Sequence, residues 1–409
     1  MSASKEMARA SKRKIMNASL LSFFPEEILL EILTKLPVKS LLQLKCVCKS
    51  AYSLFTDPFF TELHHNMCST LPGKTSILMY FPTRTSMTRH VYYTINMSEG
   101  SQGKLRSCYV SYLERKLFRK HHLRSSANGL VCLYRNPHDV IVCNLSTRQH
   151  ISLPEAHEVH GSKSPKSGCA LLGFDLVSKT FKVLKSVQYL DSHDVQKHWV
   201  FTLGVDKSWR EINIDSYFPH CSFDSFYSHS SSVYVEEVIY SLNWHRGNID
   251  DFPRCDDIAA FDVRTENLSM ISFPIGLPRH DFYSSDVFSR SGLVGLEGRL
   301  AIIQVCPNSD YKMEVWILKN CMQWENKRTI PIPLEGRKLL DRAVLLRFAS
   351  THAGEIVLVT LGRKSIFVLI YGLRMQVWRM FKVRGRFPTD NEAWKNVMHI
   401  IPENIFSLI

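Results

Sequence analysis

Few side chains in this sequence stand at the spacing that enzyme chemistry requires. Pro72-Gly73-Lys74-Thr75 ends like a phosphate-binding loop, but Cys68 stands where the first glycine of such a loop belongs, and no strand leads into it. The sequence contains no GxSxG nucleophile elbow and no HExxH zinc helix. We therefore expect no catalytic residue, no cofactor and no enzymatic activity.

Paired histidines and paired carboxylates do occur, but always as direct neighbours. His64-His65 and His121-His122 cannot present both side chains on one face of a helix or strand, so we expect them to face solvent or a partner. Glu236-Glu237 and Asp256-Asp257 stand at a strand start and beside a loop, where turn formation explains them better than acid/base chemistry does.

The eleven cysteines are scattered, and several lie inside apolar runs such as LVCLY and VIVCNL. Reduced, buried thiols fit this pattern. Cys46 and Cys48 would point in different directions on a helix, and no second pair completes a zinc site. No run approaches the roughly eighteen apolar residues of a membrane helix, and the first residues lack the apolar centre of a signal peptide. We expect the protein in the nucleus and/or the cytoplasm.

The formal net charge of +13 raises the question of an anionic partner. Part of the excess lies in Lys12-Arg13-Lys14, which is either a nuclear-import signal or a solvated terminus. The other part lies in a segment where only Glu114 opposes seven cations: Lys104, Arg106, Arg115, Lys116, Arg119, Lys120 and Arg124. A non-catalytic domain that binds nucleic acid or another anionic partner is therefore the alternative function.

The stretch 22–67 has helical periodicity. Pro25, Glu26 and Glu27 favour a helix start, and Pro37 ends that helix. A second amphipathic helix follows through Leu41 to Phe55, and Asp57-Pro58 predicts the cap of a third, short helix. Three short helices cannot cover all of their large apolar side chains, so we expect a partner to cover some of them.

This stretch resembles an F-box, the helical module that attaches substrate receptors to the Skp-type adaptor of a Skp/cullin/F-box ubiquitin ligase. The likeness lies in Phe24-Pro25, Ile32-Leu33, Leu36-Pro37, Leu41, Leu44, Val47-Cys48-Lys49 and Phe59, while Phe24 and Tyr52 replace the usual leucine and tryptophan. The resemblance implies a non-catalytic, substrate-recognition subunit that binds the adaptor and, through it, a cullin scaffold. The implied adaptor-binding residues are Pro25, Ile28, Ile32, Leu33, Pro37, Leu41 and Leu44.

From about residue 73 the pattern changes to short extended runs that Gly, Asn, Asp and Pro interrupt. A phrase of strand, polar turn and second strand recurs at intervals of 54 to 61 residues, marked by Arg148, Trp209, Leu268, Trp324 and Trp378. We expect an α+β multidomain chain: a basic flexible tail (1–21), a three-helix F-box (22–67), an all-β domain (73–390) and a C-terminal tail (391–409). The β domain is predicted to be a six-bladed propeller, with a two-sheet sandwich as the alternative.

The β body also resembles the F-box-associated, kelch-like region of plant F-box proteins, through Asn128-Gly129-Leu130 and Gly173-Phe174-Asp175. That likeness implies a rigid scaffold that holds an unidentified protein for ubiquitination and degradation. Two aromatic loops are the predicted substrate-binding segments, with Tyr217, Phe218, His220, Phe223, Phe282 and Tyr283. A carbohydrate-binding or hydrolytic propeller is a third reading, and a pair of carboxylates in the central channel would distinguish it.

Overall fold

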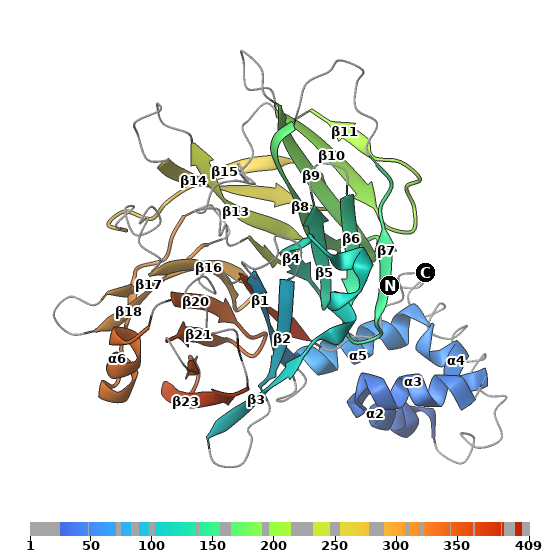
Figure 1. The fold of residues 1–409 in the computed structure, drawn as a ribbon, viewed down its shortest axis with the longest axis horizontal. Helices are drawn as coiled ribbons and strands as arrows, with labels where there is room; N and C mark the ends of the chain where they lie inside the picture. Colours follow the sequence, from blue (N-terminus) through green and yellow to red (C-terminus); the bar gives the residue numbers. More distant parts are fainter. Residues whose placement is uncertain are drawn as a thin grey trace.

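The computed structural model of the 409-residue chain consists of a small helical module followed by a ring of β-sheets (Figure 1). It describes residues 25–47, 49–70, 75–82, 90–97, 103–135, 139–155, 165–189, 196–213, 232–245, 254–277, 290–306, 311–319, 323–343, 345–362, 365–385, 387 and 397–402.

The helical module contains α2 (Glu26–Lys35), α3 (Val38–Val47), α4 (Lys49–Phe55) and α5 (Pro58–Thr70). The second expected helix is therefore two consecutive helices, and the third is longer than expected. Leu36 is extended before Pro37, as the proline requires. The Asp57 carboxylate accepts a hydrogen bond from the backbone N–H of Phe59 at 2.8 Å, which confirms the predicted cap.

The β domain contains six four-stranded units, or blades, and the propeller prediction is confirmed. Within each blade the strands pair antiparallel. Blade I is β24 (Val397–Pro402), β1 (Thr75–Pro82), β2 (His90–Asn96) and β3 (Lys104–Tyr109). Blade II is β4 (His122–Ala127), β5 (Leu130–Arg135), β6 (Asp139–Asn144) and β7 (Gln149–Ser152). Blade III is β8 (Pro165–Asp175), β9 (Thr180–Tyr189), β10 (Gln196–Thr202) and β11 (Arg210–Ile212).

Blades IV to VI repeat this order. Blade IV is β12 (Val233–Val235), β13 (Val238–His245), β14 (Arg254–Asp262) and β15 (Leu268–Ser272). Blade V is β16 (Ser291–Leu296), β17 (Arg299–Cys306), β18 (Lys312–Ile317) and β19 (Arg328–Pro331). Blade VI is β20 (Leu345–Ser350), β21 (Glu355–Leu361), β22 (Ile366–Gly372) and β23 (Val377–Arg384). Short helices η1 (Ser111–Glu114), η2 (Lys116–Phe118) and α6 (Leu334–Asp341) join neighbouring blades.

The ring is closed by its two ends. Strand β24, near the C-terminus, pairs with β1 and supplies the innermost strand of the blade that begins the β domain. The expectation that 391–409 form a tail is therefore wrong for residues 397–402. Local sequence does not reveal this strand because its hydrogen-bonding partner lies more than three hundred residues earlier in the chain.

The recurring tryptophans connect successive blades. The indole N–H of Trp209 donates to the backbone oxygen of Pro154 in the preceding blade connection, at 2.6 Å. Trp324 donates in the same way to Ser272 at 2.8 Å, and Trp378 to Pro331 at 2.9 Å. The repeated phrase thus marks an outer contact that each of these blades makes with the blade before it.

The polar turns of the repeats have a shared chemistry. The side-chain oxygens of Asn144, Asp175 and Asp262 each accept hydrogen bonds from the backbone N–H groups two and three residues later. The fourth residue after each has a positive φ: Arg148 at 59°, Lys179 at 56° and Glu266 at 58°.

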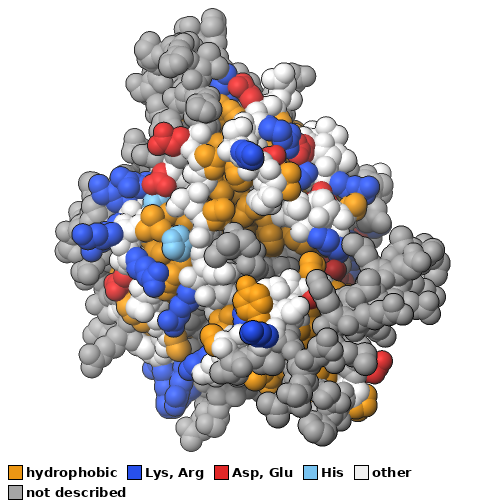
Figure 2. Space-filling model, turned by 90° about the vertical axis from the view of Figure 1, so that its right-hand side faces the viewer, with side chains coloured by type: hydrophobic (Ala, Val, Ile, Leu, Met, Phe, Trp, Pro, Cys, Tyr) orange, Lys and Arg blue, Asp and Glu red, His pale blue; other side chains and the backbone are white. Residues whose placement is uncertain are grey.

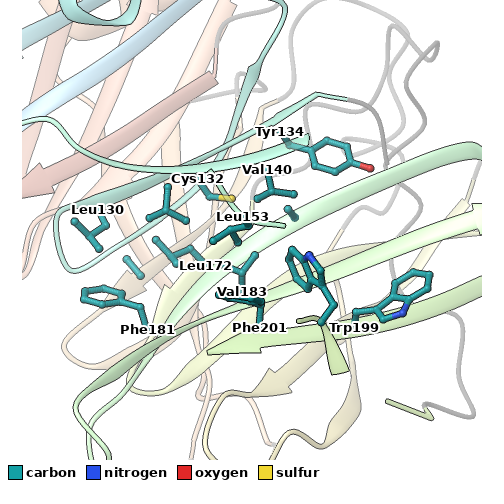
Figure 3. Packing of buried hydrophobic residues seen from close by; sticks show 14 of the residues in the cluster. Leu130, Cys132, Tyr134, Val140, Leu153, Leu172, Phe181, Val183, Trp199 and Phe201 are labelled. Carbon is teal, nitrogen blue, oxygen red and sulfur yellow. The ribbon is translucent and has the colours of Figure 1, made fainter. Parts of the chain in front are cut away.

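Apolar clusters fill the space between neighbouring blades. Between blades II and III, Leu130 and Tyr134 of blade II belong to one apolar cluster with Leu172, Trp199 and Phe201 of blade III (Figure 3). Gly173 lies where blade III approaches blade IV, and a Cβ there would come within 2.4 Å of Val263 Cγ2. The predicted Gly-Phe-Asp phrase therefore combines a close-approach glycine with a turn-forming aspartate.

Candidate adaptor-docking surface

The helical module has a small core of its own. Leu29 and Leu33 of α2 are buried together with residues of the other three helices, namely Val38, Leu41, Ala51, Leu54, Phe55 and Phe60. Leu29 and Leu33 are one helical turn apart, so they share the face of α2 that lies toward the module. This core fixes how the four helices are arranged.

The strip of α2 that adjoins this buried face, about 100° around the helix, carries apolar residues that stay partly exposed. Ile28 and Ile32 are each 46% exposed and also lie one turn apart. Pro25 and Pro37, at the two ends of α2, are exposed as well. The apolar surface of α2 is therefore broad: one part supports the module core, and the adjoining part is exposed.

The seven predicted adaptor-binding residues thus differ in exposure: four are exposed, one is half-buried and two are buried. Pro25, Ile28, Ile32 and Pro37 are exposed. Leu44 is half-buried and packs against the module core. Leu33 and Leu41, however, are only 4% and 0% exposed, so in this structure they support the module rather than offer a contact surface. The apolar pattern does not separate the exposed residues from the buried ones, because leucine and isoleucine satisfy the helical period equally well.

Two exposed aromatic residues of the module were not among the predicted site residues. Tyr52 of α4 is 55% exposed, and Phe59 at the start of α5 is 56% exposed. The ammonium group of Lys45 lies 4.7 Å from the centre of the Tyr52 ring. Both positions belong to the F-box likeness, and their aromatic character was the signal that could have identified them.

The module contacts the propeller through α5, which lies nearest the sheets (Figure 1). The Nζ of Lys179, in the turn between β8 and β9, lies 2.7 Å from Oε1 of Glu62. His65 is buried, and its ring hydrogen-bonds Asn128 in the turn between β4 and β5. Both turns join the first and second strands of a blade, so α5 lies at the end of the ring that carries these turns. We call this end of the ring the module face.

Buried histidines contribute to this contact. Burial, followed by the nearby His352 and His64, lowers the pKa of His65 to about 3, although the hydrogen bond between the ring and the Asn128 side chain opposes that shift. His64 is fully buried, and its Nε2 lies 3.2 Å from the backbone oxygen of Leu36. The expectation that His64 and His65 face solvent or a partner is therefore wrong, since both are buried by the protein itself.

The second histidine pair is also enclosed. His121 is 1% exposed, and Nδ1 of the half-buried His122 lies 2.8 Å from the hydroxyl oxygen of Tyr80. The expected exposure of His121 is wrong for the same reason. Within the described ranges, no group of three or more His, Cys, Asp or Glu side chains is arranged to hold a metal ion.

The carboxylate pairs have structural positions. Glu236 and Glu237 form the turn between β12 and β13, with φ values of 44° and 68°, as expected for a turn. Glu237 also accepts a hydrogen bond from the backbone N–H of Leu176 at 2.7 Å, which joins blades III and IV. Asp257 lies within β14, where it pairs with Ser272, so its expected place beside a loop is corrected.

The predicted substrate-binding residues Tyr217, Phe218, His220, Phe223, Phe282 and Tyr283 lie outside the described residues. The strands that flank them are described: β11 and β12 for the first group, and β15 and β16 for the second. Strands alternate in direction within a blade, and each first strand ends at the module face. The fourth strand of one blade therefore ends, and the first strand of the next blade begins, at the other end of the ring. We call this end of the ring the distal face.

Figure 2 views the side of the molecule on which the helical module lies, and shows hydrophobic side chains among lysines and arginines on that side. No helix in the part of the chain that the structure describes is both long and apolar enough to cross a bilayer.

Comparison with known proteins adds the family context. A family model described as the F-box associated beta propeller domain matches residues 76–405, and the F-box domain model matches residues 21–63. The chain is 27% identical over 389 residues to the Arabidopsis thaliana F-box protein At3g52320, covering 91% of each chain. It is also 27% identical to At3g10240 of the same plant, covering 99% of this chain and 97% of that one. A third relative, F-box protein At5g49610, shares 27% identity across 89% of this chain and 92% of its own.

Proposed function

The chain belongs to the family of F-box proteins with an F-box associated β-propeller domain, and from this premise we propose that it is a substrate-recognition subunit of a Skp/cullin/F-box ubiquitin ligase. In this role the helical module binds a Skp-type adaptor and, through it, a cullin scaffold. The propeller holds a target protein, which is tethered for ubiquitination and degradation. We place this activity in the nucleus and/or the cytoplasm.

The observation that carries the proposal is the exposed apolar face of α2. Ile28 and Ile32 remain half-exposed although the module has a formed core, and Pro25 and Pro37 at the two ends of α2 are exposed as well. Full burial of an isoleucine side chain contributes about 1.5 to 3 kcal/mol. Covering the remaining exposed fraction on an adaptor therefore supplies a favourable term that the isolated chain does not obtain.

The proposed mechanism is proximity, with no bond made or broken by this chain. A target held on the propeller shares one assembly with the ubiquitin-loaded enzyme, which raises the effective concentration of its lysines near that enzyme. A rigid connection serves this purpose better than a loose one. The buried His65 and the Lys179–Glu62 ion pair support such a connection between module and propeller.

The distal face is the proposed site for the target. It lies at the end of the ring away from α5, so an adaptor on the module does not occupy it. The loops predicted to bind substrate begin and end at strand termini on this face. Connecting loops on a rigid scaffold are where recognition residues concentrate.

Adaptor capture tests the proposal. Ile28→Asp with Ile32→Asp places two charges on the exposed face of α2 and is expected to abolish co-purification of a recombinant Skp-type adaptor. The matched control is Val177→Asp with Val205→Asp, since these propeller residues are 63% and 65% exposed. The control is expected to retain the adaptor. Equal capture by both variants would refute the proposed docking surface.

A further inference from the structure

Two neighbouring blades are joined by hydrogen bonding between their outer strands. Outer strand β23 of blade VI pairs in parallel with outer strand β3 of blade I, so the two blades form one eight-stranded sheet. Figure 1 shows the two strands at the lower edge of the ring. The register sets Lys382 opposite Lys104 and Arg384 opposite Arg106. We call these four residues the cationic rim.

The four cationic side chains share one face of this strand pair. Between them, Leu105 and Val383 are also opposite each other, and they are only 1% and 5% exposed, inside one apolar cluster. Because successive side chains in a strand point to opposite faces, the residues on either side of this buried pair point outward. Arg106, Lys382 and Arg384 are exposed and Lys104 is half-exposed.

The rim has no internal charge compensation. Strands β3 and β23 contain no acidic residue. Among the described residues, none of the four side chains makes a salt bridge or a side-chain hydrogen bond. Like charges directly opposite each other in a sheet are destabilising. This arrangement therefore favours an anionic partner, whose binding would offset the repulsion.

We propose that the cationic rim binds an acidic, extended segment of a partner protein. Opposite residues in a sheet lie about 5 Å apart, and alternate residues along a strand lie about 7 Å apart. The carboxylates at alternate positions of an extended peptide have the same spacing of about 7 Å. Such a peptide aligned with the strands places its acidic side chains beside successive cations of the rim. Since β3 and β23 are already paired with each other, the contact uses side chains rather than strand addition.

The dimensions of the rim favour a peptide over nucleic acid. Proteins that bind duplex DNA tightly neutralise about six to ten phosphates, whereas the rim offers four cations. Sites for single strands add aromatic side chains on which bases stack. Strand alternation places Tyr109 of β3 on the face opposite Lys104 and Arg106. Trp378 of β23 shares the face of Lys382, but it packs against an apolar cluster and donates its indole N–H to Pro331. The inference stands beside the proposed ligase role and does not depend on it.

Fluorescence anisotropy with a labelled eight-residue peptide, in which Glu alternates with Ser, tests the inference on the full chain. The variant Arg106→Gln with Arg384→Gln is expected to bind roughly 2- to 30-fold more weakly than the wild type, by the range for exposed ion pairs. The control Lys207→Gln with Arg264→Gln removes the same charge from exposed turns elsewhere and is expected to retain affinity. A peptide with Gln in place of Glu is expected not to bind.

Thermal unfolding without peptide gives a second readout. The Arg106/Arg384 variant is expected to melt at a higher temperature than the wild type because repulsion across the strand pair is relieved, while the control variant is not. Unchanged peptide affinity in the Arg106/Arg384 variant overturns the inference. The inference is also overturned if a single-stranded oligonucleotide binds more tightly than the acidic peptide and the Arg106/Arg384 variant weakens that binding. A rise in peptide affinity after Asp390→Asn with Glu392→Gln also overturns it, since the chain's own acidic residues would then occupy the rim.

Discussion

The buried and exposed parts of the apolar surface of α2 give the most quantitative prediction. Ile28→Ala with Ile32→Ala truncates side chains that are each 46% exposed. The chain itself already covers about half of each, so the free energy of unfolding should fall by about 1.5 to 3 kcal/mol at most for the pair. Covering that exposed fraction on an adaptor is worth about half of a full burial, or about 1.5 to 3 kcal/mol for the pair. The dissociation constant for the adaptor should therefore rise roughly 10- to 150-fold.

Leu41→Ala is the contrasting change. Leu41 is fully buried in the module core, so its truncation should lower the free energy of unfolding of the module by about 2 to 5 kcal/mol. Any loss of adaptor binding in this variant should be proportional to the fraction of the module that is unfolded. Testing the surface through Leu41 would thus confuse folding with binding, whereas the isoleucine pair changes side chains whose exposed halves an adaptor is expected to cover.

Isothermal titration calorimetry with a purified Skp-type adaptor measures the binding, and urea unfolding followed by helical circular dichroism measures the stability. The reasoning fails if the isoleucine variant binds the adaptor with wild-type affinity. It fails equally if Leu41→Ala weakens binding while the stability of the module stays unchanged.

Three further predictions concern the stability of the chain. The folded-state pKa of His65, about 3, lies below its ordinary value of 6.5, so the stability that its neutral form provides is present above pH 6.5 and is lost as the pH falls toward 3. At pH 5 the free energy of unfolding should be lower by about 2 kcal/mol, and His65→Gln should reduce this pH dependence in urea titrations. Gly173→Ala should cost about 1 to 3 kcal/mol because the added Cβ would clash with Val263. At Gly372 the added Cβ would meet Met375 at an ordinary contact distance of 3.9 Å, so Gly372→Ala should melt within a few degrees of the wild type. Trp209→Phe should lower the free energy of unfolding by about 1 to 3 kcal/mol by leaving Pro154 without its donor, and an unchanged melting temperature would contradict that role.

Much of the fold is encoded in local chemistry. Pro37 and the Asp57-Pro58 pair fix helix ends through backbone conformation and hydrogen bonding, which depend on a few neighbouring residues. The turn residues Asn144 and Asp262 act in the same local way. The end of α2, the start of α5 and the repeat of the blades were therefore predictable from the sequence, whereas the break between α3 and α4 and the length of α5 were not.

The features that the sequence did not predict depend on distant partners. Strand β24 is recognisable only through its pairing with β1, and the β3–β23 junction joins segments far apart in the chain. The burial of His65 depends on propeller turns that meet α5 in three dimensions. The division of the apolar surface of α2 into a supporting and an exposed part likewise depends on where the other helices lie, since both parts have the same apolar character.

The most direct measurement is a structure of the full chain bound to a Skp-type adaptor. The account predicts that Ile28 and Ile32 change from 46% exposed to buried, with adaptor side chains against them, while Leu33 and Leu41 keep their contacts inside the module. An adaptor seated elsewhere, with both isoleucines still in solvent, would contradict it.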